Sequence, residues 1–143
     1  MRQKNLVVML GLLVALCWCC SPAFADIVSV NRLGTSGNPE IPVIAENPLD
    51  EDALAFTDRA SHQYNGIPTF LQGAQYVMIA NDDRGVADFQ LEVVLDADAT
   101  IAVFVDLRNE QTGMGWLVDD GWTNTGALIG VDEGGNGNDG NYQ

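Results

Sequence analysis

The feature that most constrains the fold is a pair of neighbouring segments, residues 88–95 and 101–107, in which apolar side chains recur at every second position. Residues 88–95 alternate between apolar and polar side chains, which is typical of a strand with one buried face. The apolar positions of this run are Phe89, Leu91, Val93 and Leu95. Residues 101–107 are apolar on both faces, because Ala102 and Phe104 lie between the inward positions. A run of that kind predicts a central strand.

Other short segments have the composition of strands and are separated by turn residues. The additional strands are expected at residues 27–30, 53–57, 75–80 and 127–131. Asn and Asp residues predict turns at 81–85 and 96–99. Helical periodicity is scarce, and residues 114–120 are the one helical candidate. We therefore expect an all-β fold, built as an antiparallel β-sandwich.

The first 25 residues have the pattern of a secretory signal peptide. Arg2 and Lys4 precede an uncharged run over residues 6–20, and Ala-Phe-Ala at 23–25 resembles a cleavage site. The run is shorter than the ~20 residues that a spanning helix needs. We expect cleavage after Ala25, secretion to the periplasm or the exterior, and no membrane association afterwards. A lipoprotein signal is the alternative, since cysteines stand late in the run, at positions 17, 19 and 20.

The rest of the chain divides into three expected parts. Residues 26–52 are rich in Gly and Pro, and they predict an extended arm or edge strand. Residues 53–133 carry the strand pattern and are the expected sandwich domain. Residues 134–143 are rich in Gly, Asn and Asp and are expected to be a tail that adds nothing to a core.

Charge and composition exclude several classes of function. After cleavage the chain keeps four arginines against twenty acids, a net charge of −16, and has neither lysine nor cysteine. Such a surface disfavours nucleic acids and anionic membranes. Thiol and Schiff-base catalysis are excluded, and the single histidine, His62, excludes multi-histidine zinc sites. We expect no enzyme, and we expect His62 to lie in a loop.

Acidic residues at predicted strand ends and turns suggest calcium. Hard cations take six to eight oxygen ligands, many of them from turns. The candidate ligands are Asp82, Asp83, Asp106, Asp132 and Glu133. If two strand ends converge, these carboxylates could hold a structural calcium ion. The alternative is that they are ordinary turn acids on a solvated surface.

Two segments resemble a known family. The first is Gly-Ile-Pro at 66–68, continued through residues 70–77 into Ala-Asn-Asp-Asp at 80–83; the second is residues 99–108, followed by Trp116-Leu117 and residues 121–126. In order and spacing they resemble galactose-binding-like jelly-roll domains of secreted bacterial proteins. Such domains occur beside polysaccharide-degrading catalytic domains and in exported planctomycete-type proteins. The resemblance covers about residues 53–133.

The resemblance implies a jelly-roll sandwich and an accessory role beside polysaccharides. The family pattern continues past Asp-Glu-Gly-Gly at 132–135 into one or two further strands, so the resemblance implies a truncated copy and an incomplete sandwich.

Together with the Trp-rich turn, the resemblance suggests a site for a glycan. Exposed aromatic rings stack on sugar faces, while nearby polar groups bind the hydroxyls. The expected stacking residue is Trp122 or Tyr64, and the expected hydrogen-bonding residues are Asp106, Arg108 and Asn124. Trp116 is expected in the core, and core burial is the alternative for Trp122.

Two hypotheses for the function follow from these observations. The first is a secreted, non-catalytic β-sandwich module that binds extracellular polysaccharide, with a structural calcium. The alternative is a structural or adhesive exported protein with no small-molecule ligand. Exposed tryptophans would favour the first hypothesis. Buried tryptophans, with carboxylates clustered at one end of the loops, would favour the second.

Overall fold

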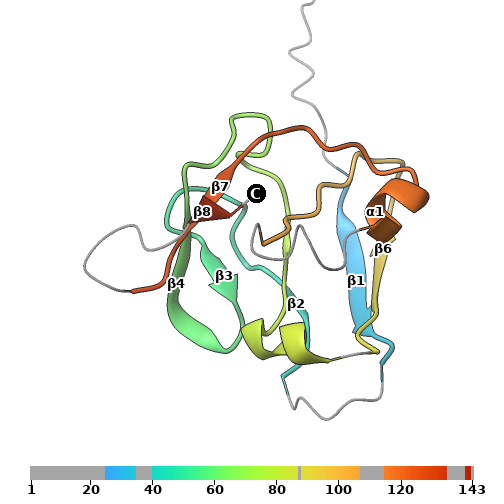
Figure 1. Cartoon of the computed structure of the whole chain (residues 1–143), viewed down its shortest axis with the longest axis horizontal. Helices are drawn as coiled ribbons and strands as arrows, with labels where there is room; N and C mark the ends of the chain where they lie inside the picture. Colours follow the sequence, from blue (N-terminus) through green and yellow to red (C-terminus); the bar gives the residue numbers. More distant parts are fainter. Residues whose placement is uncertain (1–24, 35–39, 87, 107–114, 135–140, 143) are drawn as a thin grey trace, which may run out of the picture.

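The protein is made mostly of short β-strands that pair in antiparallel fashion (Figure 1). The computed structural model describes residues 25–34, 40–86, 88–106, 115–134 and 141–142. The strands form one four-stranded sheet and two separate two-stranded sheets. The expected all-β class is therefore confirmed.

The four-stranded sheet has the order β3-β4-β7-β8. Its strands are β3 (Leu54–Phe56), β4 (Arg59–Asn65), β7 (Ile129–Asp132) and β8 (Asn141–Tyr142). Strands β3 and β4 form a hairpin, with Phe56 opposite Arg59 across a two-residue turn. Strand β4 was not predicted, because its polar sequence lacks an apolar alternation. His62 lies on this strand, where its ring contacts Phe56, so the expectation of a loop is wrong.

The two smaller sheets join segments that are far apart in the sequence. Strand β1 (Ile27–Arg32) pairs with β6 (Leu91–Leu95), and β2 (Val43–Ile44) pairs with β5 (Val77–Met78). An isolated bridge between Phe56 and Ile79 connects β3 to the end of β5. This bridge links the four-stranded sheet to the β2–β5 sheet.

The core lies against the four-stranded sheet. Its buried members are Leu49, Ala55, Tyr64, Ile67, Ile129 and Val131. Leu49 is 2% exposed, although it belongs to the segment 26–52 that was expected to be an extended arm or edge strand. The described part of that segment contains the strands β1 and β2, and Leu49 is anchored by backbone hydrogen bonds to Ala74 and Gly73. Residues before position 53 are therefore part of the packed core.

The helical segments are short. Residues 81–85, predicted as a turn, form the 3₁₀ helix η1 (Asn81–Gly85), and α1 (Gly115–Asp119) lies within the one predicted helical stretch. Each has five residues, so neither helix of the described ranges could cross a membrane.

The clearest departure from the predicted elements is the expected central strand at 101–107. Residues 101–106 form no strand, and residue 107 lies outside the described residues. Ile101 is 54% exposed and Val103 is 44% exposed, so one face of this run is open. Apolar residues at every second position indicate an extended backbone. They do not determine whether neighbouring strands are present to pair with the segment and bury both of its faces. The tail expected at 134–143 contributes β8, whose backbone pairs with β7.

Candidate binding site

The acidic residues of η1 are neutralised by arginines. The Arg59 guanidinium lies 2.9 Å from the Asp58 carboxylate and 2.5 Å from that of Asp82. The Asp58 carboxylate also accepts hydrogen bonds from the backbone N–H groups of Asn81, at 2.7 Å, and Asp82, at 3.2 Å. Asp58, which lies in the turn between β3 and β4, therefore fixes the position of the first turn of η1 through these hydrogen bonds.

These contacts change the acidity of Asp58. Burial is the largest single influence and acts to raise its pKa. The two backbone donors and the positive charge of Arg59 outweigh burial, so the pKa of Asp58 lies below its ordinary value of 3.8. Asp58 is thus held as a carboxylate, in a structural role.

Asp83 is the one buried acid of the described residues, at 3% exposure. Its carboxylate forms an ion pair with the Arg32 guanidinium, which lies 5.2 Å from the centroid of the Phe89 ring. The carboxylate also accepts the Ala80 N–H at 3.3 Å. This pair attaches β1 to η1, and a buried pair is costly to break because it leaves a charge without compensation.

The predicted calcium ligands are not assembled in the described part of the chain. There, no three of its His, Cys, Asp and Glu side chains are grouped as a metal site would require. Asp82 and Asp83 pair with arginines, and Asp132 accepts the Gly134 N–H at 2.8 Å. Asp106 and Glu133 are half-buried. Calcium binding stays a prediction.

Of the predicted glycan-binding residues that the structure describes, Trp122 alone lines one of the two pockets. Tyr64 was expected to stack on sugar, and this is wrong, because its ring is buried in the core at 6.1 Å from Tyr76 and 5.7 Å from Phe104. Burial, with a smaller contribution from Tyr76, raises the pKa of Tyr64 to about 12. Asn124 is exposed, and its side-chain oxygen accepts the Gly126 N–H at 2.8 Å. Arg108 and the side chain of Trp116 lie outside the described residues.

Trp122 is exposed, but its surroundings are apolar. The indole is 38% exposed and lines an open groove of about 770 Å³. The other lining residues are Leu33, Ile79, Phe89, Gln90, Leu91, Val93, Ile101 and Val103. Gln90 is the only polar side chain among them. Sugar hydroxyls would find few partners here, so exposure of Trp122 alone does not make a glycan site.

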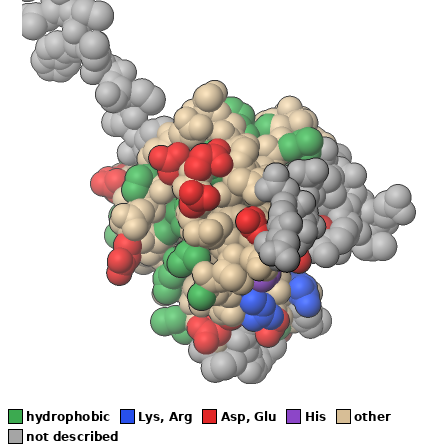
Figure 2. All heavy atoms as spheres, turned by 90° about the vertical axis from the view of Figure 1, so that its left-hand side faces the viewer, with side chains coloured by type: hydrophobic (Ala, Val, Ile, Leu, Met, Phe, Trp, Pro, Cys, Tyr) green, Lys and Arg blue, Asp and Glu red, His purple; other side chains and the backbone are tan. Residues whose placement is uncertain are grey.

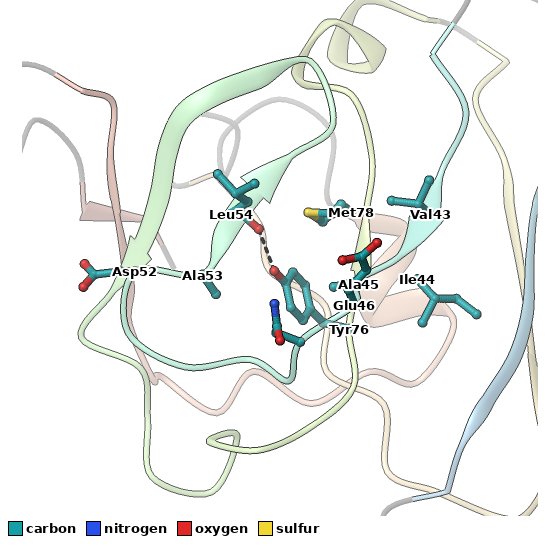
Figure 3. Close-up of a pocket in the computed structure, with 10 residues that line it drawn as sticks. Val43, Ile44, Ala45, Glu46, Asp52, Ala53, Leu54, Tyr76 and Met78 are labelled. Carbon is teal, nitrogen blue, oxygen red and sulfur yellow. Dashed lines mark hydrogen bonds between the residues drawn. The ribbon is translucent and has the colours of Figure 1, made fainter.

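A second pocket, of about 440 Å³, combines an aromatic ring with polar side chains (Figure 3). It lies where β2 and the residues after it face the start of β3. The lining residues are Val43, Ile44, Ala45, Glu46, Asn47, Asp52, Ala53, Leu54, Tyr76 and Met78. We call it the Tyr76 pocket. Its volume falls within the range of roughly 300–1,000 Å³ that is usual for small-ligand sites.

Tyr76 is held in a fixed orientation in this pocket. Its hydroxyl donates to the Leu54 carbonyl at 2.9 Å, a bond drawn in Figure 3, and its ring packs edge-on with the core ring of Tyr64. The Tyr76 carbonyl accepts the Ala45 N–H at 3.0 Å, which fixes the opposite wall. Partial burial raises the pKa of the Tyr76 hydroxyl. The aromatic surface is therefore preorganised and neutral at physiological pH.

The polar side chains of the pocket belong to Glu46, Asn47 and Asp52, and all three residues are exposed. Within the described part of the chain these side chains make no hydrogen bond, so they can bind groups of a ligand. Asp52 has a φ of 63°, the one positive value outside glycine among the described residues. Its backbone is held by the Tyr64 carbonyl and the Gln63 amide.

The sequence analysis did not predict this pocket, because its residues lie in two separate segments and form no recognisable motif. Tyr76 lies in a predicted strand, and Glu46 to Asp52 lie in the segment expected to be an arm. The pairing of β2 with β5, together with the backbone hydrogen bonds of Ala45 and Leu49 to residues 73–76, brings the two segments together.

Comparisons with protein-family models, with curated proteins and with solved structures found no match for this chain. The resemblance to galactose-binding-like domains therefore stays a prediction.

Proposed function

We propose that this protein is an exported, non-catalytic β-sandwich module that binds extracellular polysaccharide in the Tyr76 pocket. The observation that carries the proposal is the pocket itself, where an immobilised aromatic ring lies near Glu46 and Asn47. Asp52 also lines the pocket, with its carboxylate turned away from the ring (Figure 3). An aromatic face with polar groups beside it suits a sugar ring, which has apolar faces and a polar rim. The jelly-roll resemblance and the signal-peptide pattern support the same function.

Charge restricts the class of polysaccharide. Two of the three polar side chains in the pocket are carboxylates, and the chain carries a formal net charge of −14. A polymer rich in uronate or sulfate would be repelled. The ligand we propose is therefore a neutral glycan or one that carries amino groups.

The test is binding of neutral polysaccharides, measured by affinity electrophoresis and calorimetry. We expect the double substitution Glu46→Ala with Asn47→Ala to weaken binding about tenfold or more, because two hydrogen bonds at about 1 kcal/mol each are lost. Both residues are exposed, so folding should be preserved. Trp122→Ala is the matched control at the other aromatic site and should leave binding unchanged. Loss of binding in Trp122→Ala alone would move the site to the apolar groove.

A second candidate is a structural or adhesive exported protein. The observation that favours it is the apolar groove around Trp122, which offers apolar surface to another macromolecule. If the unmodified protein binds none of the polysaccharides tested, this second candidate is favoured.

A further inference from the structure

The apolar groove is open along much of its length. We define it by its lining residues, which come from β6, from the residues flanking β1 and β6, from Ile79 after β5, from residues 101–103 and from Trp122. Five of its apolar side chains are more than one third exposed; these are Leu33, Val93, Ile101, Val103 and Trp122. Contiguous apolar surface of this kind usually marks an interaction site on a soluble protein.

Backbone that has no partner within the described ranges runs beside the groove. Within the described ranges β6 pairs with β1 on one edge and with no strand on the other. Leu91 and Val93 of β6 contribute their side chains to the groove wall. Residues 101–103, two of which also line the groove, make no backbone hydrogen bond to the described chain. An occupant that covers these peptide groups must also satisfy them, since an unsatisfied buried N–H or C=O is costly.

This requirement decides between kinds of occupant. A lipid chain or an aromatic small molecule would bury the side chains but leave the peptide groups without partners. An extended polypeptide supplies apolar side chains and a row of donors and acceptors together, as in strand addition to an open sheet edge.

Charge then decides between partners. Exposed acids follow β6 at Asp96 and Asp98, and exposed acids precede Trp122 at Asp119 and Asp120. The three arginines of the described chain are engaged around η1, where Arg84 contacts the Asn81 side chain. A second copy of this acidic chain would be repelled, whereas a basic partner would be attracted.

We propose that the groove binds an extended segment of another polypeptide that is apolar on one face and basic on the other, added as a strand to the edge of β6 that no described strand occupies. The inference is independent of glycan binding, because the Tyr76 pocket and the groove share no lining residue.

The probe is a blocked nine-residue peptide of alternating valine and lysine, and its binding to the purified full chain is measured by fluorescence anisotropy. We expect at least tenfold weaker binding for a peptide with glutamate in place of lysine. We expect a similar loss when alternate peptide nitrogens on the pairing edge are methylated. Equal binding of the methylated peptide would overturn strand addition, and equal binding of the glutamate peptide would overturn the basic partner.

Two protein variants locate the site. Val103→Lys places a charge in the groove at a 44% exposed position outside any strand, and it should weaken binding at least tenfold. Val28→Lys changes the charge identically at a 59% exposed position of β1 that does not line the groove, and it should bind like the parent. Equal loss in both variants would show non-specific attraction and overturn the proposal. A dimer that Val103→Lys dissociates, seen by sedimentation, would assign the groove to a second copy instead.

Discussion

At the residue scale, individual side chains and glycines have roles that the sequence pattern does not indicate. Tyr76 lies in a predicted strand and Tyr64 does not, yet Tyr64 is a core residue whereas Tyr76 lines a pocket. The Glu51 carboxylate accepts the N–H groups of Gly66 and Ile67 at 2.9 and 2.8 Å, which fixes the turn after β4. None of these roles follows from residue type alone.

Gly130 shows how closely β4 and β7 approach each other. A Cβ at this position would collide with the Asn65 side chain on the neighbouring strand. We expect Gly130→Ala to lower the free energy of unfolding by about 1–3 kcal/mol, the usual cost of overpacking. Urea denaturation at pH 7 measures this change.

Gly115→Ala is the matched control for this prediction. Its Cβ would meet no atom within 4 Å, so we expect a change of less than about 0.5 kcal/mol. Asn65→Ala should recover part of the stability lost in Gly130→Ala, because it removes the colliding atoms. Equal stability of the two glycine variants would contradict the close approach of the strands.

At the scale of elements, tertiary contacts decided which extended segments became strands. Strand β4 has an unremarkable polar sequence, but it lies between β3 and β7 and pairs with both. The run 101–107 has a much stronger strand pattern, yet its described part has no ladder partner. A strand requires hydrogen-bonding neighbours as well as a suitable sequence, and a single sequence does not name them.

The hydrogen bonds from the first turn of η1 to the Asp58 carboxylate predict how the stability of the fold depends on pH. Because the pKa of Asp58 is lower in the folded chain than in the unfolded chain, its contribution is complete above the unfolded pKa of about 3.9. That contribution is lost as the pH falls through the lower, folded value. We expect Asp58→Asn to flatten the fall in the free energy of unfolding below about pH 4, as measured by urea midpoints from pH 7 to 2.5.

Asp98→Asn controls for the removal of one negative charge. Asp98 is exposed and its side chain makes no hydrogen bond in the described chain. The free energy of unfolding of this control should fall below about pH 4 as steeply as that of the parent protein. If the free energies of unfolding of Asp58→Asn and Asp98→Asn change with pH in the same way, the Asp58 carboxylate contributes nothing to the loss of stability in acid.

At the scale of the whole molecule, net charge is the dominant property. Twenty acids against six basic residues give a formal net charge of −14. Figure 2 shows acidic side chains dispersed over one face, with the basic ones gathered beside the histidine. Self-repulsion of this size destabilises a compact state and is screened by salt.

We therefore expect sodium chloride, raised from about 0.05 to 0.5 M, to increase Tm by roughly 2–8 °C, equivalent to about 1 kcal/mol. Thermal melts followed by circular dichroism measure the shift. Screening alone predicts the same Tm in calcium chloride at matched ionic strength, whereas the predicted calcium site requires a further rise. A Tm that falls with salt would mean that ion pairs such as Arg59 with Asp82 outweigh the repulsion.

The sequence by itself determined the all-β class, the positions of β1, β3, β5, β6 and β7, the helical turn α1, and the acidic surface. These follow from local periodicity, turn residues and composition, which act within a few residues of the chain. Tertiary structure alone decided that Leu49 enters the core, that residues 101–103 border an open groove, and that Tyr76 meets Glu46 in a pocket. Those outcomes depend on pairings such as β2 with β5, which join residues more than thirty positions apart. Local sequence preferences do not specify such contacts, because many alternative pairings satisfy the same pattern.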